Sequence, residues 1–397
     1  MHKAYRYRIY PTTEQKLFLD RHYGCCRFVY NHFLALRKEK WKNEQASLSG
    51  FDCKKMLPEL KRQHPWLAEV NSQSLQAAVL TLESAYRRFF KGLGQYPQPH
   101  KKHSRQAFSV TQNFILTNGT LRIPKLKTPI RVKQHRPLGG HPKNLTIIRE
   151  SSGKYYASVV CECVPAHLPI SDSTVGVDLG LRDLAVLSTG EKLEHPKWLR
   201  KAEKRLSKAQ RRLSRKQKGS ANRQKVRIQV ARLHERIKNQ RQDFLHKLSH
   251  RLIIENQEVS IERLRVRNMV KNRHLAKSIS DSGWSELARQ FHYKAEWYGR
   301  TVKVIDTFAP SSKTCSMCGY VHKGLKLSQR VWQCPSCLVV HDRDHNAAVN
   351  IDIIGQGMPE VTPAERRAAA VSVFSIKQVR SKKHQVGAKK QEALASQ

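Results

Sequence analysis

The sequence predicts a multidomain protein of mixed α and β structure, and three observations indicate this fold class. The chain has 397 residues, more than a single domain usually contains. Short alternating apolar runs occupy the start of the chain and residues 108–165, whereas longer stretches elsewhere carry apolar residues every three or four positions. After Asp172 the pattern changes to that of a buried strand, which indicates that a second domain begins there.

The N-terminal part is expected to contain a strand, helices and a small sheet. Lys3 to Tyr10 alternates as a strand does, and Pro11 to Glu14 then forms a turn and a helix start. A second helical stretch, Ser72 to Lys91, ends before the breaker-rich residues 96–99. The runs within residues 108–165 predict a small antiparallel barrel or sheet that pairs with the N-terminal strand.

The second part is expected to begin with strands and to continue into a helical hairpin. Val175 to Gly180 and Leu184 to Leu187 predict a buried strand, a turn and another strand. Two basic helices are predicted between about residues 199 and 248, joined through Lys218 to Asn222. Residues 356–397 are rich in Ala, Ser, Lys and Gln, so a flexible basic tail is predicted.

The net charge indicates the class of partner. With 74 Lys and Arg against 31 Asp and Glu, the formal charge is +43, and such self-repulsion opposes compaction unless a polyanion neutralises it. A merely solvated helix mixes its charges, whereas the predicted hairpin carries one sign, so it is expected to bind a phosphate backbone. The expected contacts are Arg211, Arg212, Arg215, Lys216, Arg223 and Arg227.

Three other features indicate where the protein is located. An anionic membrane would also attract this charge, but no stretch approaches the roughly 18 apolar residues of a spanning helix. The N-terminus lacks the apolar centre of a signal peptide. Nine cysteines is an odd number that suits a reducing compartment. We therefore expect a cytoplasmic protein that does not bind membranes, with a monomer favoured.

Four of the cysteines form the strongest local motif. Cys315, Cys318, Cys334 and Cys337 make two C-x2-C pairs with 15 residues between them. This spacing is typical of a zinc ribbon, in which four thiolates hold one structural Zn²⁺. Two disulfides or four unrelated thiols are the alternative, and His322 and His341 are possible substitute ligands.

Three acidic residues form the second candidate site. Asp178 follows the strand Val175 to Val177, Glu262 follows Val259 to Ile261, and Asp344 lies in the C-terminal part. Each has an ordinary alternative, because Asp178 can be a turn residue, Glu262 an exposed strand end, and Asp342 or Asp344 a helix cap. Together they resemble the RNase H-like nuclease arrangement, in which two strands and a late helix bring carboxylates together. Such carboxylates hold two Mg²⁺ ions that assist phosphodiester cleavage.

The order of these motifs resembles TnpB, the OrfB family of bacterial insertion sequences. Gly176 to Gly180, Ser260 to Leu264, the cysteine ribbon and Asp342 to Ala348 follow one another as in that family, and Tyr5 to Pro11 is similar to its opening. The resemblance covers roughly residues 1–354.

The resemblance implies a catalytic, Mg²⁺-binding triad of Asp178, Glu262 and Asp344. Asp344 is preferred to Asp342 because it occupies the family's Asp-x-Asn-Ala-Ala position. The implied fold is a wedge-like β-barrel split around a helical recognition bundle, followed by a RuvC-like nuclease domain with an inserted zinc ribbon. The implied boundaries are 1–10 and 96–171 for the barrel, 11–95 for the bundle, 172–308 and 339–355 for the nuclease domain, and 309–338 for the ribbon.

The family implies an RNA-guided DNA endonuclease of a transposable element. Its partners would be a guide RNA from the transposon end and double-stranded target DNA. The protein would read a short motif in the DNA next to the target sequence. Three alternatives remain: a nuclease-inactive regulator on the same scaffold, a transposase that joins strands, and a zinc-ribbon protein that binds RNA through charge alone. All three triad carboxylates are present, which favours the enzyme.

Overall fold

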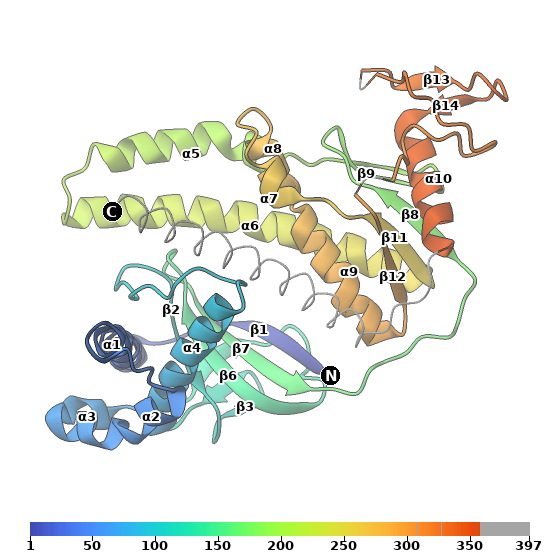
Figure 1. Cartoon of the computed structure of the whole chain (residues 1–397). Helices are drawn as coiled ribbons and strands as arrows, with labels where there is room; N and C mark the ends of the chain where they lie inside the picture. Colours follow the sequence, from blue (N-terminus) through green and yellow to red (C-terminus); the bar gives the residue numbers. More distant parts are fainter. Residues whose placement is uncertain (308, 327, 358–397) are drawn as a thin grey trace, which may run out of the picture. The chain divides into compact units, whose positions relative to one another are not determined.

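The computed structural model describes residues 1–307, 309–326 and 328–357. These residues form two compact units, Met1–Cys163 and a second unit that begins at Val164. Figure 1 shows their elements. The predicted tail, residues 356–397, lies outside the described part of the chain except for its first two residues.

The first unit is built on a seven-stranded antiparallel sheet. Its strands are β1 (His2–Tyr10), β2 (Gln106–Val110), β3 (Ile115–Thr117), β4 (Thr120–Arg122), β5 (Ile130–Lys133), β6 (His141–Arg149) and β7 (Tyr155–Glu162), in the spatial order β2-β6-β7-β1-β5-β4-β3. The N-terminal strand β1 pairs with β5 and β7, as predicted. Its Tyr5, Tyr7 and Ile9 point into the core, whereas Arg6 and Arg8 lie on the other face. Among the described residues the edge strands β2 and β3 are not paired with each other, so the sheet is a half-barrel rather than the closed barrel that was an alternative.

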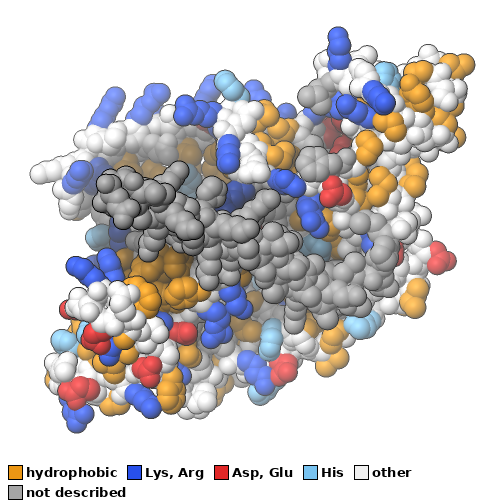
Figure 2. Space-filling view, in the orientation of Figure 1, with side chains coloured by type: hydrophobic (Ala, Val, Ile, Leu, Met, Phe, Trp, Pro, Cys, Tyr) orange, Lys and Arg blue, Asp and Glu red, His pale blue; other side chains and the backbone are white. Residues whose placement is uncertain are grey.

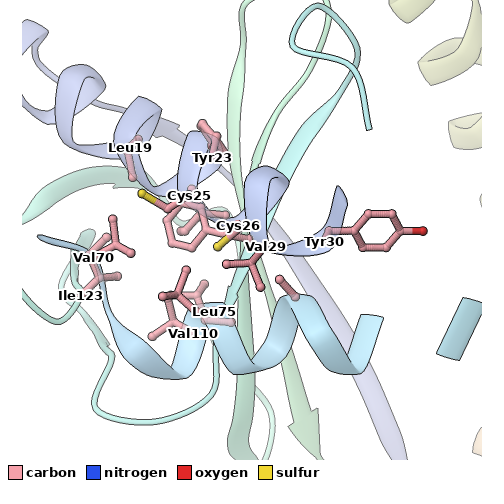
Figure 3. Packing of buried hydrophobic residues seen from close by; sticks show 14 of the residues in the cluster. Leu19, Tyr23, Cys25, Cys26, Val29, Tyr30, Val70, Leu75, Val110 and Ile123 are labelled. Atoms are coloured by element: carbon pink, nitrogen blue, oxygen red, sulfur yellow. The ribbon is translucent and has the colours of Figure 1, made fainter. Parts of the chain in front are cut away.

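Helices cover this sheet. They are α1 (Thr13–Glu44), α2 (Gly50–Lys55), α3 (Leu57–Gln63), the 3₁₀ turn η1 (Pro65–Glu69) and α4 (Ser72–Phe90). The side chains of Thr12 and Gln15 form a capping box that starts α1. Figure 3 shows Cys26 and Val29 of α1 facing Leu75 of α4 and Val110 of β2, which are all buried. The helix predicted at Ser72 to Lys91 is therefore α4.

The second unit contains a five-stranded mixed sheet. Its strands are β8 (Thr174–Asp178), β9 (Asp183–Leu187), β10 (Lys192–Glu194), β11 (Glu258–Glu262) and β12 (Thr301–Ile305), in the order β10-β9-β8-β11-β12. Strands β8, β11 and β12 are parallel, whereas β9 and β10 are antiparallel to their neighbours. The apolar runs Val175 to Val177 and Val259 to Ile261 are buried, as parallel strands covered on both faces require.

Helices and a small ribbon complete the second unit. The helices are α5 (Trp198–Ser214), α6 (Ala221–Glu255), α7 (Val266–Met269), α8 (Ala276–Ser282), α9 (Trp284–Tyr298) and α10 (Arg343–Gln356). The predicted hairpin corresponds to α5 and α6, but α6 continues past Leu248 because Leu252 and Ile253 are buried in the core of this unit. Strand β13 (Val331–Gln333) of the ribbon pairs antiparallel with β14 (Val340–Asp342), which follows residues 309–338 and leads directly into α10.

Helix α10 packs very closely on the sheet. A Cβ atom at Gly176 of β8 would lie 2.1 Å from the backbone oxygen of Ala348, and one at Gly355 of α10 would lie 2.0 Å from Oγ of Ser260. Only glycine fits at these two contacts. They hold α10, whose first turn carries Asp344, against β8 and β11.

Candidate functional site

Two of the predicted acidic residues end neighbouring parallel strands. Asp178 is the last residue of β8 and Glu262 is the last residue of β11. The register of this pair aligns Val177 with Ile261, so the two acidic residues come next on each strand. Parallel strands end at one edge of a sheet, which explains how residues far apart in sequence reach one place.

The third acidic residue is presented by the first turn of α10. Asp342 is the N-cap, and its carboxylate accepts hydrogen bonds from the N–H groups of Asp344 and His345, both at 3.1 Å. It also pairs with Lys192 of β10 at 2.7 Å. The carboxylate of Asp344 instead accepts hydrogen bonds from Nη1 of Arg330, at 3.0 and 3.3 Å. The two neighbouring aspartates therefore have different surroundings.

The electrostatics of Asp178 connect the three residues. Its pKa is raised to about 7, chiefly by burial and then by the negative charges of Glu262 and Asp344, while Arg343 and Arg330 act in the opposite direction. Partly buried carboxylates that repel one another can bind a hard divalent cation, because the positive charge of the cation offsets their repulsion. Among the described residues, however, only the four cysteines bring their ligand atoms within 4.8 Å of one another, so the three carboxylates are spread more widely.

One contact of this site was not predicted. Oγ of Ser311 donates a hydrogen bond of 2.7 Å to Oε1 of Glu262, and Ser311 is only 4% exposed. Sequence alone shows that Ser311 lies four residues before Cys315, but not what its hydroxyl group contacts. The base of the ribbon thus contacts Glu262, while Arg330 of the same ribbon contacts Asp344.

The four ribbon cysteines lie together and can hold a metal ion. The sulfur atoms of Cys315, Cys318, Cys334 and Cys337 are all within 4.8 Å of one another. The backbone N–H of Tyr320 is the largest cause of the lowered pKa of Cys318, about 6. The backbone N–H of Val339 lowers the pKa of Cys337, but hydrogen bonds with the other three cysteines raise it overall, so the thiols titrate together. A cluster of four thiolates fits the tetrahedral preference of Zn²⁺.

The two histidines considered as substitute ligands are placed differently. Nε2 of His341 lies 3.0 Å from Sγ of Cys315, so it can donate to that thiolate from beside the cluster. The ring of His322 instead packs edge-on against Trp332. Neither histidine belongs to the cluster of four sulfur atoms.

The basic hairpin presents most of its predicted cations to solvent. Figure 2 shows Lys and Arg side chains gathered along α5. Arg211, Arg212, Arg215 and Lys216 are exposed, which is what contact with a phosphate backbone requires. Arg223 is different, because its Nη1 donates hydrogen bonds to the carbonyl groups of Leu213 and Lys216, at 2.7 and 2.9 Å. This guanidinium stabilises the end of α5, a role that the charge pattern did not reveal.

The first unit contains a groove between α1, α4 and the sheet. Two adjoining hollows of about 380 and 560 Å³ share Ala77, Thr81 and Ser109 in their walls. Arginines line both hollows, and the described lining residues include no Asp or Glu. In the groove the hydroxyl groups of Tyr23 and Ser74 are buried without a hydrogen-bond partner among the described residues. Sequence analysis named no residue of this groove.

No helix within the described ranges is both long and apolar enough to cross a membrane.

Three family models match parts of the chain. Residues 158–273 match a model described as "Probable transposase" (OrfB_IS605), and residues 284–351 match the TNB domain of Cas12f1-like proteins. Residues 1–46 match a model described as a helix-turn-helix domain, although the structure has β1 and the single long helix α1 there.

Two curated relatives resemble the chain over most of its length. A protein of Streptomyces pristinaespiralis named "Putative RNA-guided DNA endonuclease" is 45% identical over 355 residues, which are 88% of each chain. The InsQ protein of Escherichia coli K12, named in the same way, is 34% identical over 381 residues, covering 90% of this chain and 93% of InsQ. Among solved structures, the Cas12f1–sgRNA–target DNA complex has 14% identity and a TM-score of 0.36, covering 89% of this chain and 99% of that one. This score is too low to support an argument about the site.

Proposed function

The chain belongs to the TnpB (OrfB) family of insertion-sequence proteins, and we propose that it is an RNA-guided DNA endonuclease of a transposable element. The two curated relatives bear that name. The observation that carries the proposal is that Asp178 and Glu262 end neighbouring parallel strands of one sheet. The raised pKa of Asp178 supports it, because after burial its causes are the charges of Glu262 and Asp344.

In the proposed site, Asp178, Glu262 and Asp344 hold two Mg²⁺ ions within a RuvC-like nuclease domain. When bound, these ions supply an activated water nucleophile and stabilise the charge on the leaving oxygen. Asp178 and Glu262 lie at one edge of a sheet, and Asp344 lies on a helix that packs against that sheet. Asp342 is better suited to capping α10 than to binding metal, because its carboxylate is already engaged by two N–H groups and Lys192.

The ribbon is proposed to hold one Zn²⁺ through Cys315, Cys318, Cys334 and Cys337. Four thiolates leave no open coordination position, so this metal would have a structural role. The proximity of the sulfur atoms supports the proposal. The same proximity disfavours the reading of four unrelated thiols.

The proposed partners are a guide RNA and a DNA duplex. The exposed cations of α5 fit the backbone of a nucleic acid. The groove of the first unit fits the edge of a duplex, because its hydroxyl and amide groups can read bases while its arginines bind phosphates. We propose that a short motif beside the target is read there, within the wedge and recognition regions that the family implies.

Replacement of one carboxylate tests the proposal. The protein should be expressed with its flanking DNA and purified, and the bound RNA should be sequenced and used to choose a target. Asp178→Asn should abolish Mg²⁺-dependent cleavage of that target, while RNA and DNA binding persist. Asp172→Asn changes an exposed acid outside the site and is the matched control. Undiminished cleavage by Asp178→Asn, or a random bound RNA population, would contradict the proposal.

The same assay separates cutting from strand joining. The family model described as "Probable transposase" favours transposase chemistry as a second candidate. Hydrolysis leaves free ends on the cut DNA, whereas strand transfer yields a longer, joined product. A joined product that disappears in Asp178→Asn would favour the transposase.

A further inference from the structure

Ser311 connects the base of the ribbon with the sheet. Its Oγ donates to Oε1 of Glu262 at 2.7 Å, and the side chain is almost fully buried. A hydrogen bond from a buried donor restricts the rotation of the carboxylate that accepts it. The hydroxyl group of Ser311 therefore defines which way one oxygen of Glu262 points.

Ser311 is itself held by α10. Nδ2 of Asn350 donates to the carbonyl oxygen of Ser311 at 2.7 Å, and the same amide donates to the carbonyl oxygen of Thr314, also at 2.7 Å. One turn earlier, Asn346 donates to Thr314 at 2.7 Å and accepts from the N–H of Ser316 at 3.0 Å. The i, i+4 spacing places both asparagines on one face of α10. Helix α10 thus binds the segment that leads into the first cysteine pair.

This network links both sides of the acidic site. On one side, Ser311 donates a hydrogen bond to Glu262. On the other side, Asp344 lies on α10, whose asparagines bind the segment that contains Ser311. Cys315 follows Thr314 directly, so a metal held by the cysteines would fix the conformation of this segment. These hydrogen bonds connect the segment before the first cysteine pair with the carboxylate of Glu262.

We propose that Ser311 is a positioning residue through which the ribbon orients Glu262 for divalent-metal binding. The inference rests on the proposed function, because it assigns Glu262 to the metal site. Groups that orient metal ligands typically change metal affinity by about 10- to 100-fold when they are removed. Ser311 is expected to act in this way without contacting substrate.

The test measures metal binding rather than cleavage. The full-length protein, with its zinc content determined, is titrated with Mn²⁺, and free Mn²⁺ is followed by electron paramagnetic resonance. Subtraction of the Asp178→Asn titration isolates the binding that depends on the acidic site. Ser311→Ala should keep its zinc and weaken this binding about 10- to 100-fold. Ser311→Thr, which keeps the hydroxyl group, should recover most of the affinity.

Two controls separate positioning from folding. Ser328→Ala removes an exposed hydroxyl group of the same ribbon and should leave the affinity unchanged. In a Glu262→Gln background, Ser311→Ala should have little further effect, because its partner carboxylate is already gone. A general disturbance of the ribbon would still weaken binding in that background.

The outcomes are distinct. Unchanged Mn²⁺ affinity in Ser311→Ala overturns the inference, and so does loss of zinc, which would assign Ser311 to the folding of the ribbon. If the wild-type protein binds Mn²⁺ through Asp178 but cleaves no guided target, the proposed function fails while the role of Ser311 stands. If it binds no Mn²⁺ that Asp178→Asn removes, both proposals fail.

Discussion

The guanidinium group of Arg330 pairs with the carboxylate of Asp344. Its Nη1 donates hydrogen bonds to both carboxylate oxygens, at 3.0 and 3.3 Å. A guanidinium and a metal cation compete for the same carboxylate oxygens.

Arg330→Gln should therefore tighten Mn²⁺ binding in the protein without nucleic acid. The pair is half exposed on its arginine side, so we expect a gain of only about threefold. Electron paramagnetic resonance of free Mn²⁺ measures it, and Lys326→Gln in the same ribbon is the control. Weaker binding in Arg330→Gln would show that the arginine supports the metal site instead of competing with it.

Gly176→Ala should destabilise the second unit and disturb the acidic site. The new methyl group would lie 2.1 Å from the backbone oxygen of Ala348 and 2.6 Å from the backbone nitrogen of Asp352, so α10 must shift. We expect a loss of about 1–3 kcal/mol in unfolding free energy, measured by denaturant unfolding.

The matched control for this change is Gly24→Ala in the middle of α1. Apart from its chain neighbours and the backbone of its own helix, no heavy atom lies within 4 Å of the position of its Cβ. Alanine favours a helix, so this variant should gain about 0.5–1 kcal/mol. A result of the same sign for both glycines would contradict the steric explanation.

Leu338→Gly should strengthen metal retention by the ribbon. Leu338 follows the second cysteine pair with φ 62°, and Gly319 follows the first pair with φ 76°. A left-handed backbone costs a branched residue about 1–2 kcal/mol, which glycine avoids. After allowance for the greater flexibility of glycine in the unfolded chain, competition with a chelator should show zinc held several-fold more tightly. Leu338→Ala keeps the Cβ and should show no such gain.

Acidification should destabilise the first unit through His22. Its Nε2 accepts a hydrogen bond from the N–H of Asn71, so Nδ1 carries the proton and donates to the carbonyl oxygen of Phe18. Burial lowers the pKa of His22 to about 4, against about 6.5 in an unfolded chain. The unfolded state therefore binds more protons between these values, and stability falls as the pH drops through this window.

His22→Gln should remove this dependence. From pH 7.5 to pH 5 the wild type should lose about 2 kcal/mol more than the variant, a difference that thermal unfolding detects. Carboxylate titrations are common to both proteins and cancel. His274→Gln replaces an exposed histidine and should follow the wild type. Parallel pH curves for wild type and His22→Gln would disprove the assignment.

Much of the fold could be predicted because it depends on local patterns. The apolar runs before Asp178 and Glu262 indicate buried strands, and their parallel pairing follows from the long helical connection between them. Strand β12 could not be predicted in this way, because the buried Lys303 interrupts its apolar run. Helices α2 and α3 are too short for a clear periodicity.

The site was less predictable than the strands that carry it. The carboxylates could be found because each follows a recognisable strand or precedes a helix. The contact from Ser311 to Glu262 joins residues 49 positions apart, and that from Arg330 to Asp344 joins a loop to a helix. Such contacts form only when the ribbon and α10 fold against the sheet, so no local sequence pattern predicts them. For Arg223 the sequence pattern did not reveal the contact that forms. Its charge predicted that it binds phosphate, whereas in the structure its hydrogen bonds stabilise the end of α5.

The place of α10 after the ribbon has a consequence for synthesis on the ribosome. Chains emerge from the N-terminus, so every strand of the second sheet and the cysteine ribbon leave the ribosome before Asp344 does. The last carboxylate then reaches its neighbours only when the newly emerged helix settles against Gly176. If Asp178, Glu262 and Asp344 act together as proposed, a nascent chain presents its basic hairpin to nucleic acid before its acidic site is complete, and a translation product interrupted before α10 would bind without cutting.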